Sequence, residues 1–311
     1  MKFSRIHTLK EIADIIKAEF DGPEDFPVHG INEIHVVEPG DIVFVDHPKY
    51  YDTALNSAAT IVLINKKVEC PEGKALLISD DPFRDFVKIG QYFNSFRSSD
   101  RMIAETAEIG EGTILQPNVF VGHDVKIGKN CLIHANVSIA NGSVIGDNVI
   151  IHSGTVLGGD AFYYKKRETG FDKLKSVGNV VLEDNVEIGA NCTIDRGVTA
   201  STTIGEGTKI DNMVQIGHDT IIGKRCLIAS QCGVAGCTVV GDDVTLWGQV
   251  GVKSGISIGD KAVVMAQSGV GGNLEGGKSY FGSPAEDVKS MYKYMAALKI
   301  MTKDFMNKKK S

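Results

Sequence analysis

The chain has 311 residues, of which 42% are hydrophobic, and a formal net charge of −6 at pH 7. This length allows two or three structural units, and 35 glycines with only eight prolines suit a turn-rich repeat and exclude a disordered linker. The N-terminus has no apolar core of signal-peptide length, and the longest aliphatic runs, such as residues 61–64, are too short to span a bilayer. We therefore expect a cytoplasmic protein without a transmembrane segment.

The charge is unevenly distributed along the chain. Residues 288–311 contain seven lysines and one aspartate, so the remainder is strongly acidic. General nucleic-acid binding needs a basic surface and is not expected. A basic end on an acidic body instead suits one acidic partner at that end.

Residues 1–100 lack any repeat and are predicted to form a small α/β domain. Thr8-Leu9-Lys10-Glu11 is a capping box that opens a short helix. Aliphatic runs at 42–45, 60–64 and 75–78 are typical of strands. Pro48 and Pro82 stand where first helical positions are expected.

The segment from Phe44 to Tyr50 is the most informative part of this domain. Phe44 and Tyr50 flank a polar strand-to-helix turn that contains His47. Aromatic side chains so spaced can stack on a planar base. The alternative is that Phe44 belongs to the core and Tyr50 is a surface ring.

From residue 101 to 278 the chain repeats every six residues, a period that fits neither a helix nor an alternating strand. It fits a short strand and a tight turn, with three such units forming one triangular coil of a hexapeptide parallel β-helix. Gly follows the aliphatic residue in many hexads, for example Gly110 and Gly217, where we expect a sharp corner to require a residue without Cβ strain. The 25 first-place residues are Ile103, Ile109, Leu115, Val121, Ile127, Ile133, Ile139, Ile145, Ile151, Leu157, Leu182, Ile188, Ile194 and every sixth residue from Ile204 to Val270.

A polar, irregular segment interrupts the repeat at residues 158–181. A loop that leaves a solenoid at one point often serves binding. Plain tolerance of an insertion at a corner is the alternative.

Cysteine and histidine are the side chains most often found as zinc ligands, and two groups of them occur in the repeat. Four cysteines fall on the inward-facing fifth place of a hexad, where they act as small apolar fillers: Cys131, Cys192, Cys226 and Cys232. There is no CxxC pair, so no metal site is predicted. His134 and His152 are 18 residues apart and should stack on adjacent coils, about 4.8 Å apart, without a third histidine to complete a metal site.

Residues 279–311 are predicted to form a C-terminal helical extension. Ser283-Pro284-Ala285-Glu286 reads as a second capping box with proline at the first helical position. Apolar residues then recur at three- and four-residue steps over two heptads, which is too short for an isolated coiled coil. It suffices if a trimeric body holds three copies together.

His218 is the candidate catalytic residue. It occupies the third place of a hexad, and Gly236, 18 residues later, should lie one coil above it. An unhindered Gly236 N–H can stabilise an oxyanion, and a neutral imidazole with a pKa of about 6.5 can act as a base. One hexad earlier, Asp211, Asn212 and Gln215 are able to hold a substrate. The alternative is an ordinary corner histidine.

The motifs ANCTIDRG, KIDNMVQIGHD and YFGSPA, the N-terminal domain and the GGDAF break resemble the UDP-3-O-(3-hydroxyacyl)glucosamine N-acyltransferases of lipid A biosynthesis. The resemblance spans nearly the whole chain. It implies a homotrimer of left-handed parallel β-helices, with His218 as general base and Gly236 as the oxyanion amide. It also implies that Phe44, His47 and Tyr50 bind the uridine of a UDP-sugar.

The same resemblance implies that the acyl chain arrives on the phosphopantetheine arm of acyl carrier protein, without a further cofactor. The lysines at 308–310 are then a docking site for this acidic partner or simply a solubilising tail. The chain departs from the family at His47, where Asn is common, and at Gly255, where members often carry histidine.

Three alternatives remain at this point. The sister UDP-N-acetylglucosamine O-acyltransferase shares the fold, the carrier and the base, but it resembles this chain only from the solenoid onward. An acetyl-CoA-dependent or other sugar-nucleotide acyltransferase is the second. A catalytically inactive solenoid that binds carrier protein is the third, and Gly255 is the departure that favours it.

Overall fold

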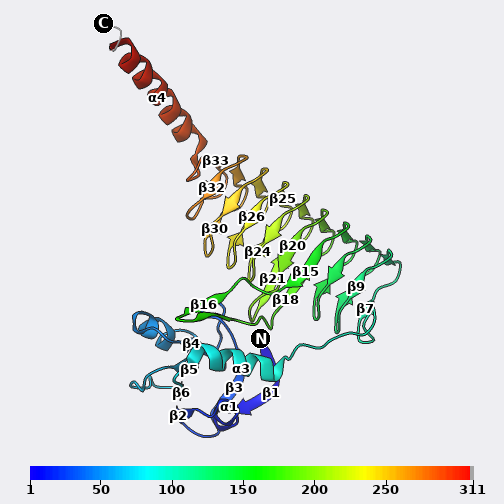
Figure 1. Cartoon of the computed structure of the whole chain (residues 1–311), viewed down its shortest axis with the longest axis vertical. Helices are drawn as coiled ribbons and strands as arrows, with labels where there is room; N and C mark the ends of the chain where they lie inside the picture. The colour runs from blue at the N-terminus through cyan, green and yellow to red at the C-terminus, as the bar shows by residue number, and fades with distance from the viewer. Residues whose placement is uncertain (309–311) are drawn as a thin grey trace.

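The computed structural model describes residues 1–308. Figure 1 shows an N-terminal α/β domain beside the first coils of a long solenoid and a single helix that projects from the far end. The predicted β-solenoid of hexapeptide repeats, with a small α/β domain and a C-terminal helix, is confirmed. No helix within residues 1–308 has both the length and the apolar character needed to cross a membrane.

The N-terminal domain is built on a six-stranded sheet with the order β1-β3-β4-β5-β6-β2. The strands predicted from the aliphatic runs are β4, β5 and β6, which pair in parallel. The prediction missed β1, β2 and β3, whose sequences are polar or short. The elements are β1 (Lys2–Thr8), α1 (Leu9–Ile16), β2 (Glu19–Asp21), β3 (Pro27–Ile31), β4 (Asp41–Val45), the 3-10 helix η1 (Pro48–Tyr50), α2 (Tyr51–Leu55), β5 (Ile61–Ile64), β6 (Ala75–Ile78) and α3 (Pro82–Phe93).

The helix starts of this domain follow the sequence signals. Thr8 and Glu11 form the predicted capping box at α1, in which each side chain bonds the backbone N–H of the other. Pro48 and Pro82 begin η1 and α3, and Asp81 caps α3 by accepting from the Arg84 N–H at 3.3 Å. The caps satisfy backbone donors that have no partner inside the first turn.

The solenoid consists of three parallel sheets, and each strand pairs with the strands one coil below and one coil above it. The first sheet contains β7 (Glu108–Ile109), β10 (Lys126–Ile127), β13 (Val144–Ile145), β18 (Asn179–Leu182), β21 (Ser201–Ile204), β24 (Ile221–Ile222), β27 (Val239–Val240) and β30 (Ser257–Ile258). The second contains β8 (Ile114–Leu115), β11 (Leu132–Ile133), β14 (Ile150–Ile151), β19 (Glu187–Ile188), β22 (Lys209–Ile210), β25 (Leu227–Ile228), β28 (Thr245–Leu246), β31 (Val263–Val264), β33 (Ser279–Phe281) and β34 (Glu286–Asp287). The third contains β9 (Phe120–Val121), β12 (Ser138–Ile139), β15 (Val156–Gly159), β20 (Thr193–Asp195), β23 (Gln215–Ile216), β26 (Gly233–Val234), β29 (Gly251–Val252) and β32 (Gly269–Val270).

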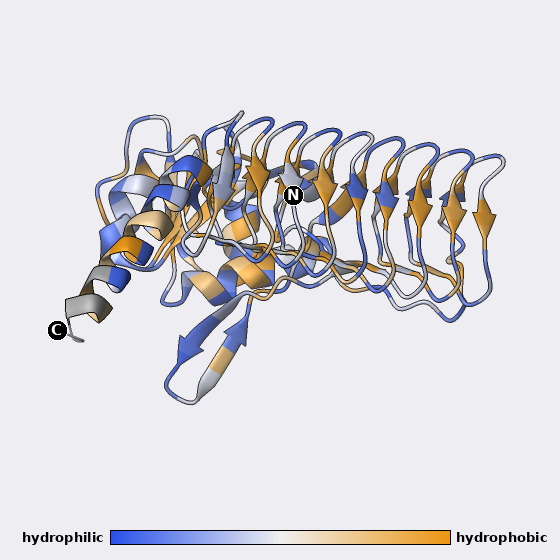
Figure 2. Ribbon diagram, turned by 90° about the horizontal axis from the view of Figure 1, so that it is seen from above, coloured by the Kyte–Doolittle hydropathy of each residue, from blue (hydrophilic) through white to orange (hydrophobic). Residues whose placement is uncertain are grey.

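The interior of the solenoid is a continuous apolar column. First-place residues such as Ile204, Ile222 and Val240 are buried and paired in register 18 residues apart. The four fifth-place cysteines are buried beside them, as predicted. Figure 2 shows the apolar residues concentrated on the strands and the polar residues in the turns.

The corner glycines do not have the role that the sequence suggested. Gly110 and Gly217 do not adopt a positive φ; instead a Cβ on Gly110 would lie 2.4 Å from the Gly128 carbonyl oxygen of the next coil. The left-handed residues occupy the fourth place of the hexad, for example Asn130 (φ 54°) and Asp219 (φ 54°). Asn and Asp tolerate this conformation better than most residues, so the second-place glycine reflects close approach between coils.

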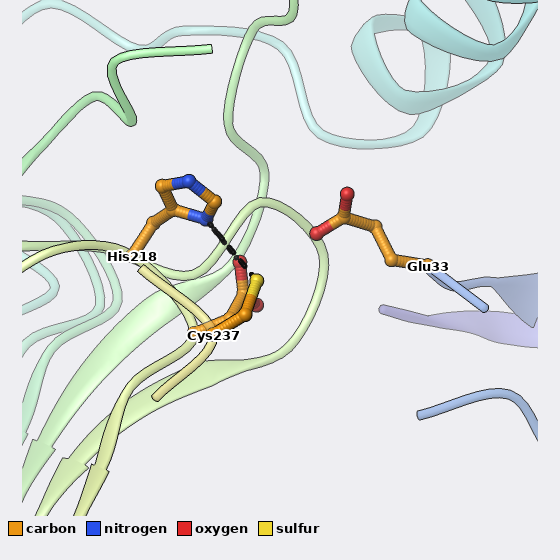
Figure 3. A group of neighbouring side chains, drawn as sticks. Glu33, His218 and Cys237 are labelled. Carbon is orange, nitrogen blue, oxygen red and sulfur yellow. Dashed lines mark hydrogen bonds and ion pairs between the residues drawn. The ribbon is translucent and has the colours of Figure 1, made fainter. Parts of the chain in front are cut away.

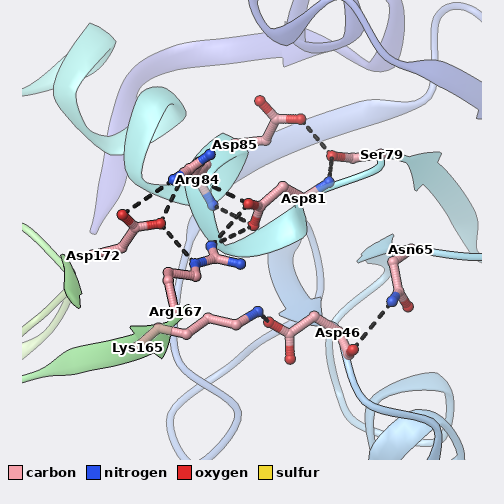
Figure 4. A network of polar contacts seen from close by, with 9 residues as sticks. All are labelled: Asp46, Asn65, Ser79, Asp81, Arg84, Asp85, Lys165, Arg167 and Asp172. Carbon is pink, nitrogen blue, oxygen red and sulfur yellow. Dashed lines mark hydrogen bonds and ion pairs between the residues drawn. The ribbon is translucent and has the colours of Figure 1, made fainter. Parts of the chain in front are cut away.

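The segment at 158–181 is not irregular but contains a hairpin, β16 (Tyr164–Arg167) and β17 (Gly170–Lys173), that reaches the N-terminal domain. Arg167 Nη2 bonds the Asp81 carboxylate at 2.8 and 2.9 Å. Arg84 Nε bonds Asp172 Oδ2 at 2.8 Å, and that oxygen also accepts from Arg167 Nε at 2.8 Å. Figure 4 shows this network and a separate ion pair between Lys165 and Asp46. The hairpin therefore fastens the N-terminal domain to the solenoid.

Replacement of Arg167 by alanine is expected to loosen the hairpin by about 1 kcal/mol, because the two-sided network with Asp81 and Asp172 is only partly screened by solvent. Amide hydrogen exchange across residues 164–173 should accelerate by a factor of about 5. Arg225→Ala is a matched control, because Arg225 makes a similar two-point bond to Asp243 on the solenoid surface. Equal protection of the hairpin in the Arg167 variant and the control would contradict the fastening role.

The C-terminal helix begins later than the sequence suggested. The predicted capping box at 283–286 is wrong, because Phe281 pairs with Glu286 in an antiparallel turn. The helix α4 (Val288–Lys308) starts after Asp287, whose Oδ1 accepts from the Lys289 and Ser290 N–H groups. Strand β33 also pairs in parallel with β31, so the solenoid continues past residue 278.

Helix α4 exposes many large apolar side chains. Those at least half exposed are Tyr292, Tyr294, Met295, Leu298, Ile300, Met301, Phe305 and Met306. The helix projects away from the solenoid in Figure 1.

Candidate active site

His218 and Gly236 lie against each other at one corner of the solenoid, as predicted. His218 follows β23, and Gly236 follows β26 on the next coil. A Cβ built on Gly236 would lie 2.7 Å from His218 Nε2, so only glycine leaves room for the ring. Within the described chain the Gly236 N–H has no acceptor, which leaves it available for an external oxyanion.

Asp219 fixes the tautomer of His218. Asp219 Oδ2 lies 2.9 Å from His218 Nδ1, and an ionised carboxylate only accepts, so the Nδ1 atom carries the proton. The basic lone pair of the neutral ring is then on Nε2, the atom that faces Gly236. Two hydrogen bonds hold Asp219 in place. Its Oδ2 accepts from the Val198 N–H at 2.7 Å, and its backbone N–H donates to Thr202 Oγ1 at 2.8 Å.

The surroundings of His218 change its proton affinity. Burial lowers the pKa of His218, but the bonds to Asp219 and Cys237 raise it, and the net result is a pKa above 6.5. Cys237 Sγ lies 4.0 Å from His218 Nδ1. Burial raises the pKa of the Cys237 thiol, but His218 and His35 outweigh it and lower the pKa to about 7. Asp219 and Cys237 thus stabilise a positive charge on the ring.

Glu33 of the N-terminal domain also reaches this corner (Figure 3). It follows strand β3, and its backbone N–H donates to Thr199 Oγ1 of the solenoid at 3.2 Å. Burial, followed by the charge of Asp219, raises the pKa of Glu33 to about 8. The site is therefore closed on one side by a different domain.

The hairpin segment contributes Tyr163, whose ring is nearly parallel to that of His218 with centroids 6.0 Å apart. Tyr163 in turn contacts Phe83, and Phe83 contacts Phe44, with centroids 6.4 and 5.9 Å apart. Burial raises the pKa of Tyr163 to about 12, so its hydroxyl is neutral. Of the two interpretations of the insertion, the structure favours a role in the site.

The predicted uridine-binding residues are divided between core and surface. Phe44 is partly buried and packs on Phe86 with centroids 4.8 Å apart. His47 and Tyr50 lie on the surface turn with ring centroids 5.8 Å apart, and Tyr50 is 53% exposed. This arrangement agrees with the structural alternative, in which Phe44 belongs to the core and Tyr50 is a surface ring. Lys49 Nζ lies over the Tyr50 ring, 5.4 Å from its centroid.

The predicted substrate-holding residues lie elsewhere on the chain. Asp211 and Asn212 follow β22 at a different corner, where they line a groove of about 480 Å³ with His152 and Trp247. Gln215 lies on β23 and donates to Asp195 Oδ2 at 2.9 Å. The single chain therefore does not bring Asp211 and Asn212 to His218.

Two further expectations concern Gly255 and the paired histidines. Gly255 is left-handed (φ 71°), and a Cβ there would meet no atom within 4 Å, so the position is open. Its N–H and the Ser254 hydroxyl both donate to the Gly236 carbonyl, at 3.2 and 2.7 Å. His134 and His152 stack as predicted, with centroids 4.9 Å apart and planes 9° apart.

Comparison with known proteins places the chain in a family. Residues 25–92 match the model described as UDP-3-O-(3-hydroxymyristoyl) glucosamine N-acyltransferase, LpxD, and residues 124–159 and 201–236 match the bacterial transferase hexapeptide model. The UDP-3-O-acylglucosamine N-acyltransferase of Helicobacter pylori (strain HPAG1) is 39% identical over 252 residues, or 74% of this chain and 75% of that protein. That of Nitratidesulfovibrio vulgaris is 40% identical over 257 residues, or 75% of this chain and 74% of that protein. The chain belongs to the UDP-3-O-acylglucosamine N-acyltransferase family.

Solved structures of acyltransferases with a different name share the solenoid fold of this chain. The UDP-N-acetylglucosamine acyltransferase of Bacteroides fragilis is 25% identical, with a TM-score of 0.54 over 62% of this chain and 73% of that chain. The Campylobacter jejuni enzyme of the same name is 21% identical, with a TM-score of 0.53 over 60% of this chain and 71% of that chain. These likenesses support the solenoid.

Asp219, Cys237 and Glu33 of the acyltransferase site were not predicted from the sequence. Asp219 and Cys237 directly follow His218 and Gly236, so the same 18-residue register could have found them. No periodic signal leads to Glu33, because it reaches the corner only through docking of the N-terminal domain.

Proposed function

We propose that this protein transfers a 3-hydroxyacyl chain from acyl carrier protein to the 2-amino group of UDP-3-O-(3-hydroxyacyl)glucosamine in lipid A biosynthesis. One observation carries the chemistry: the basic Nε2 of His218 lies beside Gly236, whose N–H has no acceptor within residues 1–308. Membership of the N-acyltransferase family supports the substrate class.

The geometry supports a direct acyl transfer. His218 Nε2 removes a proton from the 2-amino group as its nitrogen attacks the thioester carbonyl. The Gly236 N–H stabilises the tetrahedral oxyanion, a contribution of about 3–4 kcal/mol in comparable sites. The new C–N bond forms, the C–S bond breaks, and the thiol of the phosphopantetheine arm leaves with little need for acid, since its pKa is about 8.5. Asp219 stabilises the imidazolium that forms in between.

The other predicted site residues would bind the UDP-sugar. Phe44, His47 and Tyr50 would hold the uridine on the N-terminal domain. Asp211 and Asn212 would hold the sugar only if a second subunit places its groove corner against His218, which agrees with a homotrimer. Gln215, on the strand that precedes His218, would act from the same subunit. The exposed apolar face of helix α4 also suits association of three copies.

The acyl donor brings its own phosphopantetheine, so the proposal needs no other cofactor. The docking site proposed for acyl carrier protein is the lysine-rich end at 308–310. Lys308 ends helix α4, whereas Lys309 and Lys310 lie outside the described residues. A cytoplasmic location follows from the use of acyl carrier protein and remains part of this proposal.

The proposal is tested by giving the protein 3-hydroxyacyl carrier protein with either UDP-3-O-acylglucosamine or UDP-N-acetylglucosamine, and measuring thiol release and product mass. Product from the first acceptor alone is expected. Product from the second acceptor would establish the O-acyltransferase alternative. Binding of carrier protein without turnover would establish an inactive module.

The pH dependence of turnover should report the pair His218–Asp219. Because the pKa of His218 lies above 6.5, kcat/KM should rise with pH as the ring loses its proton. Asp219→Asn removes the negative charge that favours the imidazolium, so this limb should move to lower pH by about one unit, and the plateau should fall. Glu33, Tyr163 and Cys237 lie beside the same ring, and His35 lies beside Cys237; all four stay unchanged in the comparison.

Asp124→Asn is the control for this experiment. Asp124 belongs to the other Gly-His-Asp triplet, and its carboxylate binds Arg97 on the surface. Its pH profile should match that of the wild type. An unshifted limb in Asp219→Asn would show that His218 is not the titrating base.

A further inference from the structure

Four different donors converge at the corner that contains His218. They are the carboxylates of Glu33 and Asp219, the imidazole of His218 and the thiol of Cys237, and one donor atom of each lies within 4.8 Å of the others. They come from the N-terminal domain and from two successive coils of the solenoid (Figure 3). Because the sequence separates them by up to 204 positions, no local motif indicated a metal site.

Two oxygens of this cluster lack a partner. Glu33 Oε2 and Asp219 Oδ1 are buried without a hydrogen bond among the described residues. The Asp219 side chain is 1% exposed, and Glu33 as a whole is 9% exposed. A buried, unpaired carboxylate oxygen costs free energy unless a cation or a donor satisfies it. Both oxygens belong to side chains of the cluster, which points to a positively charged ligand there.

We propose that Glu33, His218, Asp219 and Cys237 form a binding site for a zinc-class divalent cation. One nitrogen, one sulfur and two oxygens match the donors that Zn²⁺ accepts, whereas Mg²⁺ and Ca²⁺ prefer oxygen alone. Bond lengths of about 2.0–2.3 Å place donors roughly 3.3–3.8 Å apart in a tetrahedron. His218 Nδ1 and Cys237 Sγ, 4.0 Å apart, already approach that separation.

The stacked pair His134 and His152 is a weaker candidate. Their planes are 9° apart, so the in-plane lone pairs run parallel and do not converge on one ion. His152 Nε2 is also 3.1 Å from Glu187 Oε1, which partners it. The corner cluster alone combines convergent donors with unpaired oxygens in the described chain.

Occupation of the corner site would inhibit the enzyme, a consequence that rests on the proposed function. The cation would take His218 Nδ1 and displace its bond to Asp219. Withdrawal of electron density through the ring then makes Nε2 a weaker base. Since Glu33 belongs to the N-terminal domain, the same ion would also link that domain to the solenoid.

The site is tested on the metal-free, full-length protein by Zn²⁺ titration in competition with a chromophoric chelator, and by the absorption spectrum with Co²⁺. We expect one ion per chain and a thiolate-to-cobalt charge-transfer band. Cys237→Ser should remove the band and weaken Zn²⁺ binding at least about tenfold, and Glu33→Gln should weaken it while retaining the band. Cys70→Ser, which changes the other partly exposed thiol, should bind as the wild type does.

Equal Zn²⁺ affinity in wild type and Cys237→Ser, or a Co²⁺ spectrum without the thiolate band, would overturn the site. Either result would leave acyl transfer untouched, since turnover is measured without metal. If Zn²⁺ binds the wild type with the expected band but does not lower turnover, the inhibitory consequence is overturned. Inhibition that is lost together with binding in Glu33→Gln supports it.

Discussion

Replacement of His218 by alanine is expected to lower kcat by about 10²–10⁴-fold, the usual contribution of a positioned general base. The variant lacks the nitrogen that takes the amine proton, while Gly236 and Asp219 keep their backbone positions. The measurement is steady-state thiol release from 3-hydroxyacyl carrier protein with UDP-3-O-acylglucosamine. KM for the acceptor should change little, because the imidazole acts on the reacting nitrogen and not on the nucleotide.

His123→Ala is a matched control for this substitution. His123 occupies the same place in the other Gly-His-Asp triplet, but its ring contacts Arg97 and the Ser98 carbonyl on the surface. It should retain wild-type turnover. A similar loss in both variants, or none in His218→Ala, would remove His218 from the mechanism.

Replacement of Gly236 by alanine is expected to lower kcat by about 10²–10³-fold without unfolding the solenoid. The backbone of Gly236 is not in the left-handed region, so alanine fits it. The added methyl would lie 2.7 Å from His218 Nε2, which forces the ring aside and fills the space beside the oxyanion donor. A displacement of about 1 Å at a reacting group costs on the order of 10²-fold.

The Gly236 experiment combines kcat with the thermal unfolding midpoint. Gly251→Ala serves as the control, because Gly251 lies on the next strand of the same sheet and a Cβ there meets no atom within 4 Å. The control should retain activity within about twofold. Full activity in Gly236→Ala would contradict the proposal that Nε2 and the amide act on the same reacting group.

The six-residue period predicted the solenoid and the central pair of the site. A shift of 18 residues equals one coil, so the period alone placed Gly236 above His218 and His134 beneath His152. Burial of Cys131 and Cys192 followed from the same register. These features depend on neighbours at a fixed sequence separation, which a repeat specifies.

Features that depend on packing between different parts of the chain were not predictable in this way. Glu33 and Tyr163 reach His218 because the N-terminal domain and the hairpin dock against the corner. The sequence predicted that the C-terminal helix begins near residue 284, but it begins at Val288. Residues 281–286 form a turn in which Phe281 pairs with Glu286, so the predicted capping box does not form. Second-place glycines such as Gly217 were assigned to backbone strain, although the approach of the next coil explains them.

Successive coils stack at strand spacing, so the number of coils between two residues determines their separation along the solenoid axis. One additional 18-residue turn inserted between residues 218 and 236 would part the imidazole from its amide by about 4.8 Å while leaving every ladder in register. The same turn inserted in the repeat between residues 163 and 218 would carry both groups away together and leave Glu33 and Tyr163 behind. The number of coils before His218 must therefore match the position at which the N-terminal domain docks. The length of the solenoid is constrained by the geometry of the active site as well as by folding.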